Sequence, residues 1–153
     1  MGKPLLEVRD LKVSFTTEDG VVRAVNGVSF EVGEGETLGI VGESGSGKTV
    51  TVMSVMRLIL DHNARFEGQV IYKGRDLMRL GRKQVREVRG AEIAMIFQDP
   101  MTSLNPVYRV GWQIAEQIRA HEQVSAQAAR ARAVDLLQAV GIPNPRQRVD
   151  DYP

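Results

Sequence analysis

An eight-residue stretch of the chain has the residue types of a phosphate-binding loop. Its sequence, Gly42-Glu43-Ser44-Gly45-Ser46-Gly47-Lys48-Thr49, fits the pattern G-x-x-x-x-G-K-[ST] at every fixed position. Glycines let the main chain approach an anion closely, so that successive N–H groups can point at phosphate oxygens. Lys48 would add a full positive charge, and Thr49 a hydroxyl for Mg²⁺, which prefers oxygen ligands. The stretch therefore predicts a site for a magnesium-bound nucleoside triphosphate.

The segments on both sides of this loop match the structure that such a site needs. Residues 37–41 form a nearly continuous apolar run, which is typical of a buried parallel strand. Residues 50–60 are long enough for a helix, and Val50, directly after the loop, is included among the predicted nucleotide-binding residues. Strand, glycine-rich loop and helix in this order begin an α/β unit. This context favours a nucleotide site over a chance glycine-rich turn.

The first forty residues predict short antiparallel strands. Turns are expected at Asp19-Gly20 and at Asn26-Gly27, two dipeptides that favour tight hairpins. The four apolar or alternating runs that they help to separate are residues 5–8, 12–16, 21–25 and 28–32.

After the predicted nucleotide-binding helix, strands and helices both recur. A strand is expected at 68–72 with a turn at Lys73-Gly74, and an apolar strand at 93–97. Helices are expected at 77–89, 110–122 and 126–140, the last of them beginning after Ser125 and ending at Gly141.

Composition narrows the class of protein. The 153 residues suit one domain, and a chain that is 42% hydrophobic and 25% charged can form a packed core. A net charge of +1 gives no overall electrostatic argument for nucleic-acid binding. The chain has no cysteine, which excludes disulfides and thiolate metal sites, and no apolar run approaches the length of a membrane span. A soluble protein is expected.

Together with the P-loop and the strand-rich N-terminus, the string Met95-Ile96-Phe97-Gln98-Asp99-Pro100 resembles the ATP-binding subunit of ABC transporters. Residues 37–48 and 97–106 are similar to its dipeptide, oligopeptide and nickel importer branch. The resemblance implies an α/β fold, a P-loop NTPase domain of the ABC type that is truncated at its C-terminal side. In that fold 1–36 would be an antiparallel β region, 37–100 the nucleotide-binding core with P-loop and Q-loop, and 101–153 the start of a helical subdomain.

The resemblance also implies roles for residues outside the P-loop. Gln98 occupies the position of the Q-loop glutamine, which contacts Mg²⁺ and the attacking water, so Lys48 and Gln98 are the expected catalytic residues. Phe15 occupies the position of an aromatic residue that stacks on adenine, with apolar contacts from residues 22–25. The sequence pattern alone also allows Gln98 to be an ordinary polar residue after a strand, and Phe15 to be a core residue.

ABC proteins of this branch work in assemblies. The resemblance implies a second ATP-binding subunit, two membrane-spanning permease subunits and, indirectly, a solute-binding protein, with the chain on the cytoplasmic face of the cell membrane and no nucleic acid. Residues 101–122 correspond to the region that meets the membrane subunits. Tyr108 and Trp112 could anchor that interface, because aromatic side chains dominate interface energetics, or could pack inside the helical subdomain.

Four parts of an ABC ATPase site are not found in the sequence: the Walker B aspartate, the glutamate after it, the switch histidine and the LSGGQ signature. We therefore expect the chain to be the N-terminal portion of a longer ATPase subunit and not to turn over ATP by itself. Two alternatives stay open, a non-catalytic nucleotide-binding fragment and a soluble ABC-type ATPase acting on nucleic acid or ribosomes. The second is supported only by residues 73–90, with seven basic and two acidic side chains.

Overall fold

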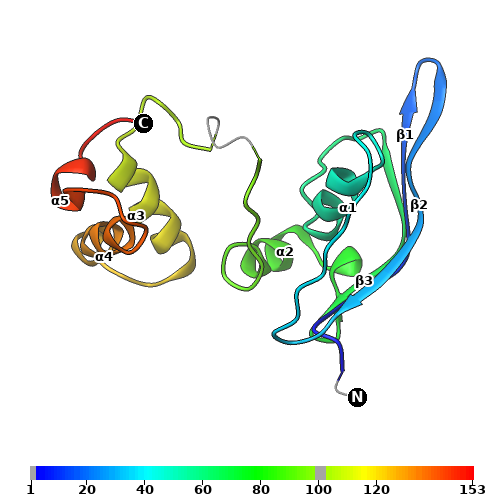
Figure 1. Ribbon diagram of the computed structural model, residues 1–153, viewed down its shortest axis with the longest axis horizontal. Coiled ribbons are helices and arrows are strands. Elements are labelled where there is room, and N and C mark those ends of the chain that lie inside the picture. Colours follow the sequence, from blue (N-terminus) through cyan, green and yellow to red (C-terminus); the bar gives the residue numbers. More distant parts are fainter. Residues whose placement is uncertain (1–2, 99–102) are drawn as a thin grey trace. The chain divides into compact units, whose positions relative to one another are not determined.

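The computed structural model describes residues 3–98 and 103–153. These residues belong to two compact units, Met1–Arg89 and Gly90–Pro153. The first unit contains an antiparallel sheet and short helices, and the second is helical (Figure 1). Each unit is described by itself.

The sheet of the first unit has four antiparallel strands in the order β2-β1-β3-β4. The turn predicted at Asp19-Gly20 is present one residue earlier, at Glu18-Asp19, because β1 and β2 form one hairpin in which Thr17 pairs with Gly20. The predicted turn at Lys73-Gly74 is also confirmed, with φ values of 46° and 78° that suit a tight hairpin turn. The strands are β1 (Leu6–Thr17), β2 (Gly20–Val32), β3 (Ala64–Tyr72) and β4 (Arg75–Asp76).

The predicted turn at Asn26-Gly27 is wrong, and the four short strands expected at the N-terminus are two long ones. Leu11 pairs with Val28 and Lys12 with Asn26, so Gly27 is an extra residue of β2, a β-bulge. Its φ of 78° is the left-handed conformation that favours glycine in a bulge as well as in a turn. The sequence signal was therefore real, but a bulge and a turn share it.

Two further irregularities bend the sheet. β1 carries an extra residue near Asp10, which has a φ of 45°, and Gly68 of β3 lies opposite it. A Cβ on Gly68 would be 2.4 Å from the carbonyl oxygen of Asp10, so only glycine fits there. A register shift after Val13 leaves Ala24 as an extra residue of β2.

Helix α1 (Lys48–Val55) follows the glycine-rich loop and contacts β1 and β2. It begins two residues before the predicted range and ends well before residue 60, because Arg57 takes a left-handed conformation with φ 50°. The residues that α1 buries are Thr51, Ser54 and Val55, and the strands bury Val8, Leu11, Val13, Val25, Val70 and Tyr72.

Two predicted strands are absent from the part of the chain that the structure describes. Residues 37–41 belong to no strand, and residues 93–97 show only a single bridge, at Ile93. Most apolar side chains of these segments are exposed to solvent, Val41 to 93% and Ile96 to 97%, whereas Ile93 and Met95 are partly buried. A strand exists only when a neighbour satisfies its main-chain hydrogen bonds, and no described strand lies beside either segment.

The predicted helix at 77–89 is divided in two. A 3₁₀ helix, η1 (Leu77–Arg79), is followed by extended Leu80 and then by α2 (Arg82–Val88). α2 buries Val85 and Val88 and leaves Arg82, Lys83 and Arg86 exposed.

The second unit contains α3 (Val110–His121), α4 (Ala126–Ala139) and α5 (Pro145–Arg148). The predicted helices at 110–122 and 126–140 are confirmed to within one residue. Ser125 begins α4 by accepting a 3.1 Å hydrogen bond from the N–H of Ala128, and Gly141 follows the helix with a φ of 79°. α5 was not predicted. The core of this unit is Ala133, Leu137 and Val149, with Val110, Ile114 and Val134 packed against it.

Candidate nucleotide-binding site

The glycine-rich loop wraps from the end of residues 37–41 to the first turn of α1. Gly45 and Gly47 have φ values of 79° and 88°, and Gly47 is the residue on which α1 begins. A Cβ on Gly47 would lie only 2.3 Å from the carbonyl oxygen of Ala24, the bulged residue of β2. The bulge therefore brings the sheet backbone against the start of α1, and position 47 admits only glycine.

Lys48 closes over the loop from the first position of α1. Its ammonium Nζ donates hydrogen bonds to the carbonyl oxygens of Gly42 and Glu43, both at 2.7 Å, and to the Ser46 hydroxyl at 3.2 Å. The N–H of Ser46 donates to the same Glu43 oxygen at 3.2 Å. These bonds hold a full positive charge at the centre of the loop, next to an exposed main chain.

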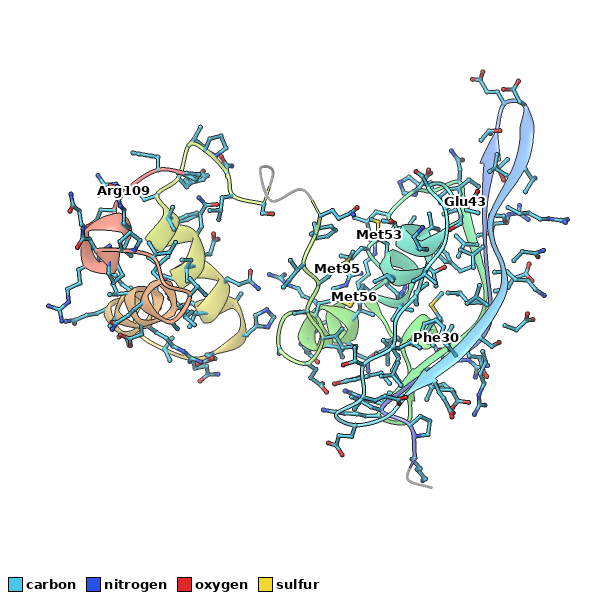
Figure 2. All side chains as sticks on the ribbon, in the orientation of Figure 1. Phe30, Glu43, Met53, Met56, Met95 and Arg109 are labelled. Atoms are coloured by element: carbon cyan, nitrogen blue, oxygen red, sulfur yellow. The ribbon has the colours of Figure 1, made fainter. Side chains whose placement is uncertain are left out.

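The N-terminal end of α1 supplies main-chain donors to the same place. Thr51 donates its N–H to the Gly47 carbonyl at 2.8 Å, the first bond of the helix. The N–H groups of Gly47, Lys48, Thr49 and Val50 therefore have no acceptor within the helix, as at every helix start. Such donors, with the positive end of the helix dipole, favour an anion. Glu43 and Met56 mark the two ends of this loop-and-helix segment in Figure 2.

The first turn of α1 also presents an oxygen ligand for a cation. Thr49 is exposed at the second position of the helix. A hydroxyl suits Mg²⁺, because this hard cation takes few protein ligands and completes its shell with water and substrate phosphates. No group of three or more His, Cys, Asp or Glu side chains that could hold a metal exists among the described residues. The donor set fits a metal that arrives with its phosphate.

Phe15 lies on the face of the sheet that meets the loop. It follows Val13 by two residues, so both side chains point to one face of β1, where Val13 pairs with Val25 and Phe15 with Val22. Val25 faces the loop, because its Cγ2 would be 3.8 Å from a Cβ on Gly47. Val13 and Val25 are buried, Phe15 is partly buried and Val22 is exposed. Phe15 is therefore partly open to solvent on the same face of the sheet as Val25.

Gln98 is exposed and belongs to the second unit, whereas the P-loop belongs to the first. Its action on a nucleotide at the P-loop therefore stays a prediction. Asp99, Pro100, Met101 and Thr102, which complete the string after Gln98, lie outside the described residues.

Sequence reasoning missed three residues near the site. Ala24 carries no chemical signal, because its importance comes from a bulge that exposes its carbonyl oxygen. Arg89 donates to the carbonyl oxygen of Met56 at the far end of α1, and Arg57, which follows that helix, donates to the carbonyl oxygens of Leu77 and Leu80. Burial and the nearby Arg57 charge lower the pKa of Arg89. Two arginines in unremarkable helical stretches gave no pattern that could have identified this pair.

Tyr108 and Trp112 are neither fully exposed, as interface anchors would be, nor fully packed inside the helical unit. Their rings stack on each other with centroids 4.5 Å apart, and each residue is about half exposed. They line an open groove of about 580 Å³ in the second unit, together with Leu104, Ile118 and Leu136. No described helix is long and apolar enough to cross a membrane.

The sequence of the chain is similar to a protein family and to several named proteins. The ABC transporter family matches residues 25–153. The oligopeptide transport ATP-binding protein of Bacillus subtilis is 53% identical over 150 residues, 97% of this chain and 42% of that protein. The dipeptide transport ATP-binding protein of Escherichia coli is 50% identical over 97% of this chain and 46% of its own length. The chain thus spans about half the length of the curated relatives it matches.

Solved structures show the same fold at lower sequence identity. A dimeric ATP-binding cassette in a post-hydrolysis state, bound to ADP and Pi, aligns with a TM-score of 0.78 and 18% identity over 97% of this chain and 61% of that one. An ABC transporter component from Clostridium perfringens aligns with a TM-score of 0.66 and 21% identity over 99% of this chain and 55% of that one. The predicted α/β fold of the ABC type is confirmed, and the chain belongs to the ABC transporter family.

Proposed function

We propose that the chain binds Mg²⁺ and ATP through residues 42–50 and is part of the energy-coupling ATPase subunit of a peptide importer. The single observation that carries the proposal is the ammonium of Lys48, held over the loop beside the N–H groups at the start of α1 that have no acceptor within the helix. A triphosphate needs donors on more than one side, and a loop, a lysine and a helix start provide them together.

The two outer parts of the proposed site are Phe15 and Gln98. Phe15 would cover the base, since it shares a face of the sheet with Val25, which faces the loop. Gln98 would contact Mg²⁺ and the attacking water through its amide, which can offer an oxygen without a charge to neutralise. Lys48 and Gln98 are then the catalytic residues of this chain, and Thr49 and Gln98 the residues that reach the metal.

The proposed substrate and partners follow the similar proteins. The relatives are described as oligopeptide and dipeptide transport ATP-binding proteins, which favours a peptide over nickel as the solute. One solved relative is described as dimeric, which supports pairing with a second ATP-binding subunit. We propose that the pair works beneath two permease subunits at the cytoplasmic face of the membrane, with the groove beside Tyr108 and Trp112 receiving a permease segment.

Calorimetric titration of the full-length protein with ATP and Mg²⁺ tests the proposal. We expect Lys48→Ala to abolish binding, because the charge that faces the phosphates is lost. Lys83→Ala is the matched control, since this exposed lysine of α2 lies outside the loop and its loss should leave affinity unchanged. An unchanged affinity in Lys48→Ala would refute the site. Binding to RNA or DNA that weakens with salt would instead favour an ATPase acting on nucleic acid.

A further inference from the structure

Two partly buried arginines hold the end of α1 that lies farthest from the phosphate loop. Arg89 donates from Nε to the carbonyl oxygen of Met56 at 2.7 Å, and from Nη2 to the carbonyl oxygen of Arg57. Arg57 in turn donates from Nη1 to the carbonyl oxygens of Leu77 at 3.1 Å and Leu80 at 2.5 Å. The guanidinium of Arg89 therefore binds the end of α1, and that of Arg57 binds main-chain oxygens at both ends of η1.

The acceptors of Arg89 are main-chain groups that helix geometry leaves free. Met56 is the residue that ends α1, and the last carbonyl groups of a helix have no partner within it. A cation at that end also interacts favourably with the helix dipole. The planar fork of a guanidinium can bind two such oxygens at once, which the single ammonium of a lysine does less well.

This arrangement exists despite an electrostatic cost. Two guanidinium groups lie close together, and neither has a carboxylate within ion-pair distance among the residues that the structure describes. Burial and the neighbouring Arg57 charge lower the pKa of Arg89. The contacts that Arg89 makes are therefore its hydrogen bonds to the main-chain oxygens of Met56 and Arg57.

The position of Arg89 in the chain gives these contacts a consequence. Arg89 directly follows α2 and is the last residue of the first unit, and the segment from Gly90 to Gln98 begins immediately after it. α1 therefore has the phosphate loop at its start, and its end is tied by two hydrogen bonds to the residue from which the segment with Gln98 departs.

We propose that Arg89 is a positioning residue that links the P-loop helix to residues 90–98, so that nucleotide binding at the start of α1 alters the segment that carries Gln98. The inference rests on the proposed function, because it needs a nucleotide at the loop. Arg89 touches neither nucleotide nor metal in it. Its role is to make the end of α1 and the beginning of the segment move as one body.

Hydrogen–deuterium exchange of the full-length protein, with and without a non-hydrolysable ATP analogue and Mg²⁺, tests this link. In the unsubstituted protein we expect nucleotide to slow exchange both in residues 42–50 and in residues 90–98. In Arg89→Ala the slowing at 42–50 should persist, while that at 90–98 falls at least threefold. Arg89→Lys, which keeps the charge but loses the fork, should fall between the two and serves as the test if the alanine variant does not fold.

Two control variants separate a link from a general loss of structure. Arg86→Ala removes an exposed charge from the same helix, and Arg57→Ala removes the neighbouring guanidinium but leaves both acceptors of Arg89 in place. Both should retain the full change at 90–98. In the assembled ATPase, Arg89→Ala should lower kcat about tenfold with little change in KM, because binding persists while Gln98 is misplaced.

Three results would overturn the proposal. An undiminished change at 90–98 in Arg89→Ala would show that the link is not needed, and an equal loss in Arg57→Ala would show that any damage to this region has the same effect. Absence of slowing at 42–50 in the unsubstituted protein would refute the proposed function, and the link with it.

Discussion

Replacing Gly47 with alanine tests how tightly the phosphate loop is seated on the sheet. A Cβ at this position would be 2.3 Å from the Ala24 carbonyl oxygen, and the backbone would have to keep a φ of 88°. Gly45→Ala is a matched control, because Gly45 has a φ of 79° but no heavy atom within 4 Å of its Cβ position. The two variants share the conformational cost and differ in the clash.

The structure allows the magnitude to be worked out. The left-handed conformation costs about 1–2 kcal/mol for a residue other than glycine, which applies to both variants. The gain from a less flexible unfolded chain, about 0.4–1 kcal/mol, is also shared and cancels in the comparison. Since Ala24 is main chain and cannot rotate away, Gly47→Ala adds a cost typical of overpacking, about 1–3 kcal/mol. We therefore expect Gly47→Ala to lower the free energy of unfolding of the first unit by about 1–3 kcal/mol more than Gly45→Ala.

Amide exchange in urea is the suitable assay. The sole tryptophan, Trp112, is in the second unit, so its fluorescence does not report on the loop. Exchange at the buried β1 and β2 residues Val13 and Val25 reports unfolding of the first unit directly. Equal free energies for the two variants, within about 0.5 kcal/mol, would refute the claim that the bulged carbonyl confines the loop.

Four further predictions concern other parts of the chain. Gly111→Ala should destabilise the second unit by about 1–3 kcal/mol in thermal unfolding followed by tryptophan fluorescence, because its Cβ would be 2.1 Å from Val149 Cγ2; an unchanged midpoint would contradict this close packing. Ser125→Ala should cost about 1 kcal/mol in the same assay through loss of the helix cap, whereas Ser125→Asp should cost little. The hydrogen bond from Arg130 holds the pKa of the Asp150 carboxyl below its usual range. The ion pair therefore stabilises the folded state above an unfolded pKa of about 3.9, and this stabilisation is lost as the pH falls through the lower folded pKa. Asp150→Asn should therefore flatten the acid limb of the stability profile, and an unaltered limb would argue against the ion pair. Phe15→Ala should weaken the binding of ATP by about 1–3 kcal/mol but leave the binding of inorganic tripolyphosphate unaffected, and equal weakening of both would exclude a contact of Phe15 with the adenine base.

The parts of the fold that depend on local chemistry could be predicted from the sequence. The hairpin turns before Gly20 and at Lys73-Gly74 use residues with positive φ, and the helix start at Ser125 needs a side-chain acceptor, so these residue types indicate their structures. The residues of the phosphate loop were identified for the same reason, since close approach to an anion needs glycine and a cation.

The parts that depend on distant partners could not be predicted. An apolar run such as 37–41 indicates a strand only if another strand lies beside it, and composition does not say which segment that is. Asn26-Gly27 suits a bulge as well as a turn, and only the pairing of β1 with β2 decides between them. The bonds that Arg89 donates join residues 33 and 32 positions apart, and those that Arg57 donates join residues 20 and 23 positions apart, beyond any local pattern.

The bulges also fix the alignment of the strands. Asp10, Gly27 and Gly68 have left-handed backbones at the same level of three neighbouring strands, so none of the strands can slide without forcing an ordinary residue into such a conformation. The Ala24 bulge lies in the same strand, three residues before Gly27. This fixed alignment therefore also decides which carbonyl faces the start of α1. Deleting Asn26, which lies between the two bulges, would turn Val25 to the other face of the sheet and remove the contact of the sheet with the loop. Every residue proposed to bind the phosphates would still be present.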